Sequence, residues 1–475
     1  MDVQRAVTAE LDRMAPVIDE LGARFEDAGH ELALVGGPVR DAMLGRASND
    51  LDFASSARPE QTEGILRTWG DAWWDMGRRF GTIGCRKGDW VVEVTTYRSE
   101  AYDPDSRKPE VQYGDTLAGD LVRRDFTVNA MAVRVPGREI EDPYGGVVDL
   151  AHKVLRTPGR PEDSFSDDPL RMMRAARFAA QLGFTVDDQV LAAMRDMADR
   201  ISIVSAERVR DELVKLVCAP YPRLGLTLLV ETGLADRVLP ELPALKLERD
   251  EHHRHKDVYE HTLTVLEQAV EQEDRLGGGP DFVSRFAALM HDVGKPRTRR
   301  FLDDGTVTFH HHDVVGAKLT RKRMRELRFS GETIDAVAHL VELHLRFHGY
   351  GSGEWTDSAV RRYVRDAGDQ LERLHVLTRA DCTTRNRRKA ERLRRTYDEL
   401  ETRIAKLAEE EELAAIRPDL DGNQIMEVLG IPPGRDVGAA YHFLLDLRLD
   451  RGPMEEDQAR EALLAWWAAR SGRGL

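Results

Sequence analysis

The sequence predicts an α+β fold for the first 150 residues and a mostly α-helical fold for the remainder. Residues 31–150 mix short β-rich runs with glycine and proline punctuation. From about residue 160 onward strand signals nearly vanish, and long segments with helical apolar periodicity replace them. A chain of 475 residues is long enough for three or four domains.

The expected elements follow from apolar spacing. Residues 1–30 carry apolar side chains at helical intervals and predict one amphipathic helix. β-branched and apolar runs predict strands at Leu32–Val35, Leu51–Ala54, Trp90–Thr96 and Met131–Val135. Later segments with helical periodicity predict helices at Pro169–Leu182, Asp187–Arg200 and Ala206–Val217.

Composition narrows the class of protein. No run of about 18 apolar residues is present, so a membrane span is not expected. The first residues lack the basic start and apolar core of a secretory signal, and three scattered cysteines fit a reducing cytoplasm. The net charge of −15 argues against indiscriminate nucleic-acid binding. Arginines nevertheless cluster locally, which suits a protein that takes one structured RNA and releases it.

Two carboxylates separated by one residue mark the second predicted strand. Side chains alternate faces along a strand, so Asp50 and Asp52 point the same way. Such a pair is usually two exposed surface carboxylates. Close carboxylates also repel unless a cation lies between them, and this layout holds one or two Mg²⁺ ions against a nucleotide triphosphate.

A double glycine precedes this pair, between an apolar strand and a helix. Alone it is more often only a turn. Here Gly36 and Gly37 let the backbone approach phosphate oxygens, while Arg40 and the helix N-terminus add positive potential. In this order and spacing, the glycines and the carboxylates predict a nucleotidyltransferase.

Polar side chains between residues 123 and 131 predict contacts to the nucleotide. Asp125 and Asn129 are four residues apart and would share one face of a helix. A carboxylate and an amide can bracket the hydroxyls of a ribose, and Arg124 can reach a phosphate. The alternative is that Asp125 only caps a helix and Asn129 lies on the surface.

A second arginine-rich motif starts the next predicted helix. Asp168 and Arg171 offer one acceptor and several fixed donors, which can contact the Watson–Crick edge of cytosine or adenine. Arg174 and Arg177 continue the stripe and would contact the nucleotide or hold the pocket. The alternative is a basic amphipathic helix, in which Arg171, Arg174 and Arg177 would have no assigned function.

These motifs resemble the polymerase-β-like superfamily and, within it, class II CCA-adding enzymes and bacterial poly(A) polymerases. The resemblance implies a polymerase-β-like nucleotidyltransferase head, a small mixed sheet with helices, followed by a helical neck, an HD domain and a C-terminal region. It implies that Asp50 and Asp52 are the catalytic residues and bind Mg²⁺. It leaves Glu93 open as a third metal ligand. The implied nucleotide-binding residues are Gly36, Gly37, Arg40, Asp41, Arg124, Asp125, Asn129, Asp168, Arg171, Arg174 and Arg177.

A histidine-rich region resembles the HD phosphohydrolase signature. The resemblance implies a divalent transition metal held by His261, His291, Asp292 and Asp381, with His312 and His344 available for a second ion. Such ions can activate water for attack on a phosphate ester. The alternative is a retained helical fold without catalysis. The expected domains are the head at 1–155, the neck at 156–250, the HD domain at 251–385 and the C-terminal helical region at 386–475.

The resemblance implies template-independent addition of C, C and A to the 3′ end of tRNA. CTP and ATP would be the substrates, tRNA the partner and pyrophosphate the leaving group, with no membrane partner; the oligomeric state is left open. Two alternatives share the head: a poly(A) polymerase and a partial CC-adding enzyme. A third, of another class, is a metal-dependent phosphohydrolase whose head only senses nucleotide.

Overall fold

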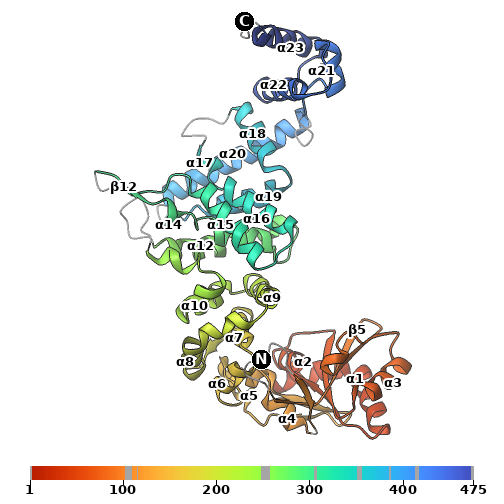
Figure 1. The fold of residues 1–475 in the computed structure, drawn as a ribbon. Coiled ribbons are helices and arrows are strands. Elements are labelled where there is room, and N and C mark those ends of the chain that lie inside the picture. Colours follow the sequence, from red (N-terminus) through yellow and green to blue (C-terminus); the bar gives the residue numbers. More distant parts are fainter. Residues whose placement is uncertain are drawn as a thin grey trace. The chain divides into compact units, whose positions relative to one another are not determined.

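The computed structural model describes residues 3–101, 110–114, 116–247, 257–303, 307–349, 356–383, 387–411 and 417–471. Internal contacts divide the chain into two compact units, Met1–Pro243 and Ala244–Leu475. The long strands all belong to the first unit, whereas the described part of the second is almost entirely helical (Figure 1). The predicted α+β head and helical remainder are therefore confirmed.

A seven-stranded mixed sheet forms the centre of the head. The strands lie in the order β3 (Ala72–Trp74), β4 (Thr82–Lys87), β5 (Trp90–Thr96), β2 (Asp50–Ser55), β1 (Leu32–Val35), β8 (Ala132–Val135) and β9 (Glu139–Glu141). β2 and β5 pair in parallel, and every other pair in this sheet is antiparallel. A separate antiparallel pair consists of β6 (Arg98–Ala101) and β7 (Glu110–Tyr113).

The N-terminal helix packs on this sheet as its apolar spacing predicts. Met14, Ile18 and Leu21 are fully buried in α1, which contacts β1 and α2. Burial of this stripe is what holds a helix of this length to the sheet. The helices of the head are α1 (Val3–Asp27), α2 (Gly37–Met43), α3 (Pro59–Trp69), α4 (Leu117–Val122) and α5 (Gly146–His152).

Helices follow the sheet, and α7 is their centre. It packs against both α9 and α10, and most of its residues are buried. The predicted helix at 187–200 is shorter than expected, because α8 ends at Met197 and continues as a 3₁₀ turn. Two short strands, β10 (Val154–Leu155) and β11 (Thr185–Val186), were not expected. These helices are α6 (Pro161–Asp167), α7 (Leu170–Leu182), α8 (Asp188–Met197), α9 (Ala206–Val217), α10 (Pro222–Glu231) and α11 (Ala235–Val238).

The second unit has two helical cores. In one, α12, α13, α16 and α19 contact one another; in the other, α21, α22 and α23 surround Leu420, Ile425 and Leu444. A short hairpin joins β12 (Arg300–Phe301) to β13 (Val307–Thr308). The helices are α12 (Val258–Val270), α13 (Phe282–Met290), α14 (Lys295–Thr298), α15 (His312–Glu326), α16 (Gly331–Leu343), α17 (Arg346–Gly349), α18 (Asp357–Ala367), α19 (Leu371–Ala380), α20 (Arg387–Glu411), α21 (Gly422–Leu429), α22 (Arg435–Arg451) and α23 (Glu456–Ser471).

Length and apolarity together would identify a membrane-spanning helix. Among the helices in the described ranges, none has both at the level that crossing a bilayer requires.

Candidate active site and candidate metal centre

Three carboxylates lie together on one face of the head sheet. Along β2, Asp50 and Asp52 are exposed while Leu51 is buried, as the predicted alternation requires. In the parallel ladder Asp52 is the register partner of Glu93 on β5, so both side chains leave the sheet on the same face. Although Asp52 reaches solvent, the protein atoms crowded around it reduce its hydration and raise the pKa of its carboxyl, and the neighbouring charge of Glu93 raises this pKa further. No ion pair joins these carboxylates to Lys or Arg within the described residues, so their charge suits a bound cation.

The glycine turn beside them needs residues without a side chain. Gly36 follows β1 with φ 72° and ψ −129°, a conformation that favours glycine. A Cβ atom at Gly36 would lie 3.0 Å from Nη1 of Arg124. The turn therefore brings bare backbone and a guanidinium to the same place, as a phosphate site requires.

A chain of buried polar contacts connects α2 to the segment after α4. Arg40 Nη1 donates to the Asn129 side-chain oxygen at 2.7 Å, and its Nε and Nη2 donate to Asp41. Asn129 Nδ2 in turn donates to Asp125 at 3.0 Å. Arg40 thus holds Asn129, and both residues line the pocket.

Asp125 and Asn129 are adjacent, but not on an α-helix as predicted. Phe126 is extended, and only Thr127–Asn129 form a 3₁₀ turn. Arg174 Nε donates to Asp125 at 2.8 Å, which ties α7 to the head. Burial alone would raise the pKa of Asp125, but Arg174 and the Asn129 bond outweigh it and lower the pKa to about 2. Asp125 is therefore a carboxylate at neutral pH and can accept from a ribose hydroxyl.

A buried carboxylate that the sequence reading missed positions two arginines. Asp120 accepts from Arg123 at 2.6 Å and from Arg124 at 2.9 Å. Burial alone would raise its pKa, but these two guanidinium groups lower it. Asp120 lies three and four residues before its partners, so helical spacing was the available signal.

The side chains of the predicted base-reading pair are each held by a different partner. Asp168 accepts from Arg208 Nη2 on α9 at 2.7 Å, and Arg208 was not predicted. Arg171 instead donates to Ser164 Oγ at 3.0 Å and to the carbonyl of Arg123 at 2.5 Å. These bonds fix the planes of both side chains where they line the pocket.

Arg177 is also anchored by a residue that was not predicted. Its Nε donates to the buried Glu212 at 2.6 Å, and its guanidinium lies 3.9 Å from the centre of the Phe178 ring. Arg40 and Arg174 also lie near that ring, each at 5.3 Å. Phe178 is thus a common support for three guanidinium groups.

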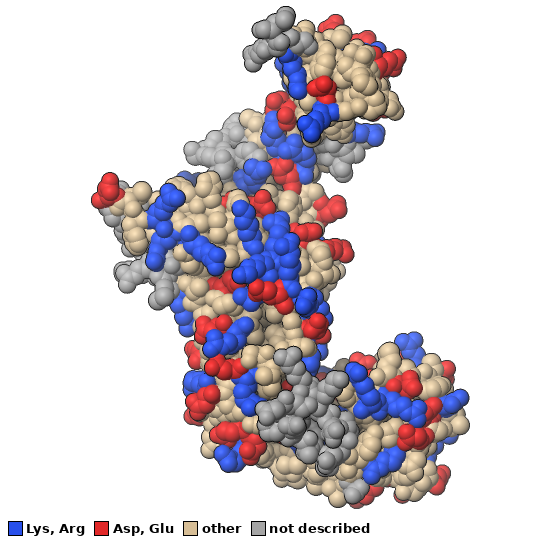
Figure 2. All heavy atoms as spheres, viewed as in Figure 1, with Lys and Arg blue, Asp and Glu red and all other residues tan. Residues whose placement is uncertain are grey.

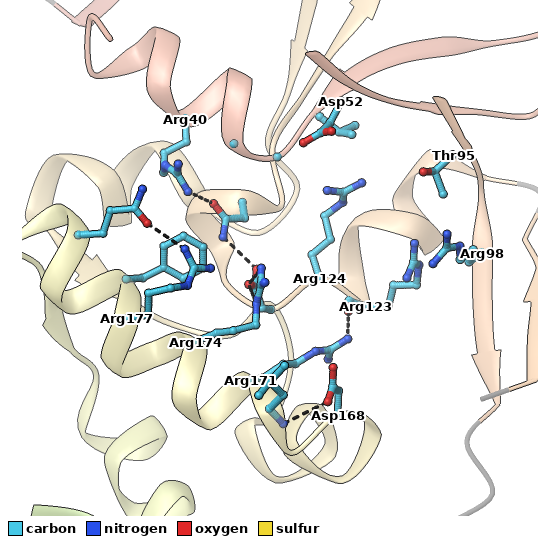
Figure 3. A pocket seen from close by; sticks show the side chains of 18 of the residues that line it. Arg40, Asp52, Thr95, Arg98, Arg123, Arg124, Asp168, Arg171, Arg174 and Arg177 are labelled. Carbon is cyan, nitrogen blue, oxygen red and sulfur yellow. Dashed lines mark hydrogen bonds and ion pairs between the residues drawn. The ribbon is translucent and has the colours of Figure 1, made fainter. Parts of the chain in front are cut away.

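One pocket of about 520 Å³ collects these side chains (Figure 3). Every nucleotide-binding and catalytic residue predicted in the head and neck lines it except Asp41 and Asp50. Asp41 holds Arg40, and Asp50 lies on the same strand face as Asp52. Arg98 and Arg123, which were not predicted, line the side that Figure 3 shows near Thr95. A cation-rich pocket with one edge of carboxylates suits a nucleotide triphosphate and its metal.

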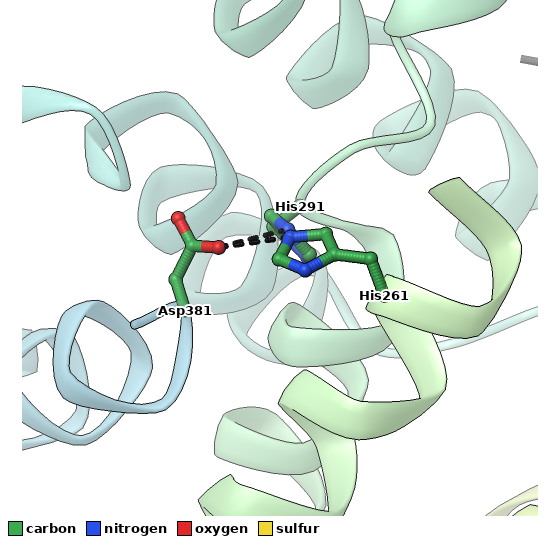
Figure 4. Close-up of side chains that lie close together, drawn as sticks. All are labelled: His261, His291 and Asp381. Carbon is green, nitrogen blue, oxygen red and sulfur yellow. Dashed lines mark ion pairs between the residues drawn. The ribbon is translucent and has the colours of Figure 1, made fainter. Parts of the chain in front are cut away.

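The second unit holds the predicted histidine and aspartate cluster. His261 Nε2 lies 3.0 Å from Asp381 Oδ1, and His291 Nε2 lies 3.2 Å from Asp292 Oδ2 (Figure 4 shows His261, His291 and Asp381). His261 comes from α12, His291 and Asp292 follow α13, and Asp381 follows α19. The four predicted ligands therefore meet in one place.

His312 and His344 belong to the same centre. Asp292 Oδ1 lies 3.4 Å from His312 Nε2, which lies 3.2 Å from His344 Nε2. The ligand atoms fall into two groups, His261–His291–Asp381 and Asp292–His312–His344. Because its two oxygens face different groups, Asp292 can bridge two ions.

Backbone carbonyls set the orientation of the histidine rings. Nδ1 of His291, His312 and His344 each lies 2.6–2.8 Å from the carbonyl oxygen three residues earlier. Donation from Nδ1 leaves the Nε2 lone pair facing the centre, as metal ligation requires. His291 Nε2 and Asp292 Oδ2 are buried 3.2 Å apart, and Lys295 Nζ lies 2.8 Å from the same oxygen, yet neither atom makes a hydrogen bond of good geometry among the described residues. Buried ligand atoms with poorly satisfied hydrogen bonding fit a bound divalent cation.

Without a cation the centre must hold a proton. Burial lowers the pKa of His291, but Asp292 and Asp381 overcome this and raise it to about 9. Burial and the neighbouring His291 lower the pKa of His344 to about 3. A bound cation would displace the His291 proton and would use His344 in its neutral form.

Comparison with known families assigns three segments. Residues 32–156 match the poly A polymerase head domain, residues 183–245 match the probable RNA and SrmB-binding site of polymerase A, and residues 258–386 match the HD domain. The A-adding tRNA nucleotidyltransferase of Deinococcus radiodurans is 34% identical over 442 residues, which cover 92% of this chain and 95% of that protein. The chain belongs to the tRNA nucleotidyltransferase and poly(A) polymerase family. It is therefore a nucleotidyltransferase with an HD domain.

Other members of the tRNA nucleotidyltransferase and poly(A) polymerase family match over shorter or more divergent stretches. The CCA-adding enzyme of Bacillus subtilis is 40% identical over 225 residues, and the match spans about half of each protein, 47% of this chain and 54% of that enzyme. The structure of the Bacillus stearothermophilus CCA-adding enzyme in complex with CTP has a TM-score of 0.68 at 24% identity and covers 96% of this chain and 98% of its own. The Thermotoga maritima CCA-adding enzyme complexed with tRNA has a TM-score of 0.61 at 18% identity and covers 98% of this chain and 99% of its own. These likenesses establish a shared fold.

Proposed function

We propose that this chain adds C, C and A to the 3′ end of tRNA from CTP and ATP. The observation that carries the proposal is the pocket, in which the Asp52 carboxylate lies opposite several oriented guanidinium groups. CCA-adding relatives match about half of the chain, and the relative that matches 92% of it is named a tRNA nucleotidyltransferase. The reaction would take place in the cytoplasm.

Different residues of the pocket would bind the triphosphate, the ribose and the metal ion, according to their chemistry. The Gly36–Gly37 backbone and Arg124 would bind the triphosphate, while Asp125 and Asn129 would bind the ribose hydroxyls. Asp50 and Asp52, with Glu93 beside them, would hold Mg²⁺, which lowers the pKa of the RNA 3′-hydroxyl and neutralises charge in the transition state. The hydroxyl oxygen attacks the α-phosphorus in line, the bond to the β-phosphate oxygen breaks and pyrophosphate leaves. Positioning and charge supply the catalysis without a covalent intermediate.

The proposal is tested with tRNA that lacks its terminal trinucleotide. CTP alone is expected to give two added residues, and CTP with ATP is expected to give three and then stop. Long tails from ATP on varied RNA ends would identify a poly(A) polymerase instead. Addition that stops at CC in the presence of ATP would identify a partial enzyme.

A second candidate is addition of the terminal A alone. It is favoured by the relative that aligns over nearly the whole chain, which is an A-adding enzyme. The same assay separates the two: an A-adding enzyme incorporates nothing from CTP but extends a tRNA that already ends in CC.

A second activity is proposed for the HD centre, hydrolysis of a phosphate ester. Its support is the paired ligand set in which Asp292 bridges two groups of inward-facing Nε2 atoms. Such a centre, when loaded with divalent transition-metal ions, activates a water molecule for attack on phosphorus. Release of phosphate from a generic phosphomonoester, lost in a His291→Ala variant, is the measurement.

Arg171→Ala is expected to reduce base discrimination. Arg171 and Asp168 line the pocket, and a site that hydrogen-bonds its substrate rejects the wrong partner because buried polar groups are then left unpaired. We expect the preference for CTP and ATP over UTP and GTP to fall by about ten- to a hundredfold. Competition assays measure it, with Arg195→Ala, an exposed arginine on α8, as control. Unchanged nucleotide choice in a folded Arg171→Ala protein contradicts the base-reading role.

A further inference from the structure

One stretch of this acidic chain is strongly basic. Residues 295–328 contain ten Lys and Arg but four Asp and Glu, in a protein of net charge −15. They form α14, the β12–β13 hairpin and α15 in the second unit. Figure 2 shows Lys and Arg side chains gathered on the face of this unit that the view presents. Residues 295–328 therefore carry a local excess of positive charge.

Helix α15 presents its cations on one side. Lys318, Lys322 and Arg325 are exposed and lie at helical intervals, so they share a face. The opposite face is buried through Ala317 and Met324. No ion pair involves Lys318 or Arg325 within the described ranges. These two charges are consequently available to a polyanion.

The hairpin next to α15 adds an aromatic side chain. Phe301 is 71% exposed, and the Arg299 guanidinium lies 5.4 Å from its ring centre. Arg297 and Arg300 are exposed on either side of Arg299. An exposed ring among arginines is what stacking of an unpaired base requires, since every base has a π-face.

This region is continuous with the HD centre. Helix α15 begins at His312, and Lys295 Nζ at the start of α14 lies 2.8 Å from Asp292 Oδ2. α14 and α15 also contact each other. A phosphate chain that lies along α15 would thus end at residues of the metal centre.

We propose that these residues form an RNA-binding surface, the α15 surface, comprising Arg297, Arg300, Phe301, Lys318, Lys322 and Arg325. The cations bind backbone phosphates and Phe301 stacks on an unpaired base. The proposal rests on the proposed function, in which tRNA is the substrate of the head. It also implies that the ligand of the HD centre is a nucleic acid, which carries phosphodiester bonds. A membrane surface fits less well, because the apolar side of α15 is buried inside the unit and the chain is acidic overall.

The test is the affinity of the full chain for tRNA without its terminal trinucleotide, measured by fluorescence anisotropy at about 50 to 200 mM salt. In the Lys318→Ala/Arg325→Ala variant we expect the Kd to rise about tenfold and the slope of log K against log salt to fall by about 1.8, which is two phosphate contacts. The control is Arg24→Ala/Arg67→Ala, which removes the same charge from exposed positions of α1 and α3. Phe301→Ser should weaken binding several-fold with no change in the slope.

The outcomes separate the alternatives. If both double variants bind within twofold of each other, the α15 surface is not an RNA site. If the Lys318→Ala/Arg325→Ala variant loses binding only to phosphatidylserine vesicles, the surface is a membrane site and the proposal fails. A wild-type protein that binds tRNA through this surface but adds no nucleotide refutes the proposed function and leaves the surface standing.

Discussion

Replacing Asp52 with alanine is expected to abolish nucleotide addition while tRNA binding is retained. Asp52 lines the pocket on the strand face that it shares with Asp50 and Glu93, and desolvation and carboxylate crowding already raise its pKa. If Asp52 holds Mg²⁺ as proposed, removing it takes away a metal ligand where charge develops in the transition state. Charge stabilisation of several kcal/mol corresponds to at least about a thousandfold in rate.

Single-turnover addition to tRNA measures this loss, and anisotropy measures binding. Asp50→Ala should behave like Asp52→Ala, because both side chains leave β2 on one face. Asp75→Ala is the matched control, since Asp75 is an exposed carboxylate of the head outside the pocket. Full turnover by either β2 variant would remove the metal assignment.

The same assay decides whether Glu93 is a third metal ligand. Its register opposite Asp52 could not be read from the sequence, because the pairing of β2 with β5 joins residues that are 41 positions apart. If Glu93 is a ligand, Glu93→Gln loses activity nearly as far as Asp52→Ala. If it only crowds Asp52, Glu93→Gln keeps most of the activity.

Short sequence patterns predicted those features of the head that depend only on residues close together in the chain. Period-two burial placed Asp50 and Asp52 on one face, and the positive φ of Gly36 explains why a glycine follows β1. Strand β5 was predicted residue for residue at Trp90–Thr96, because its β-branched run is bounded by turns.

Partners distant in sequence could not be predicted in the same way. Arg208 and Glu212 lie on α9, 35 to 40 residues from the side chains that they hold on or near α7. Nothing in the spacing of α7 shows which of its arginines will be anchored by another helix. Asp168 and Arg171 were predicted as a base-reading pair from their spacing, whereas the bond from Arg208 to Asp168 depends on the packing of α9 on α7.

The HD ligands also divide into what the sequence could predict and what depends on distant packing. The sequence named all six side chains, whereas their grouping depends on the approach of α15 to the loop after α13. That approach requires Gly294, where a Cβ atom would lie 2.0 Å from the carbonyl oxygen of His312. Only the packed structure shows that Asp292 faces both groups.

Asp292→Ala is therefore expected to remove both ions from the HD centre, whereas His344→Ala should remove one. Asp292 Oδ2 faces His291 and Oδ1 faces His312, so each group loses a ligand when this side chain is removed. His344 belongs to one group alone. The measurement is bound Mn²⁺ per chain after equilibration, made in an Asp50→Ala/Asp52→Ala background so that the head contributes none.

His339→Ala provides the matched control, because His339 lies on α16, the helix that His344 follows, but bonds the Asp366 carbonyl instead of the centre. Its Mn²⁺ content should equal that of the parent. Metal that binds only the folded protein at a hundred times its Kd stabilises by about 2.7 kcal/mol, so the Mn²⁺-dependent rise in Tm should vanish in Asp292→Ala and persist in His339→Ala. Two ions retained in Asp292→Ala would refute the bridge. A parent that binds none would make this domain a helical scaffold whose inward-facing imidazoles serve packing.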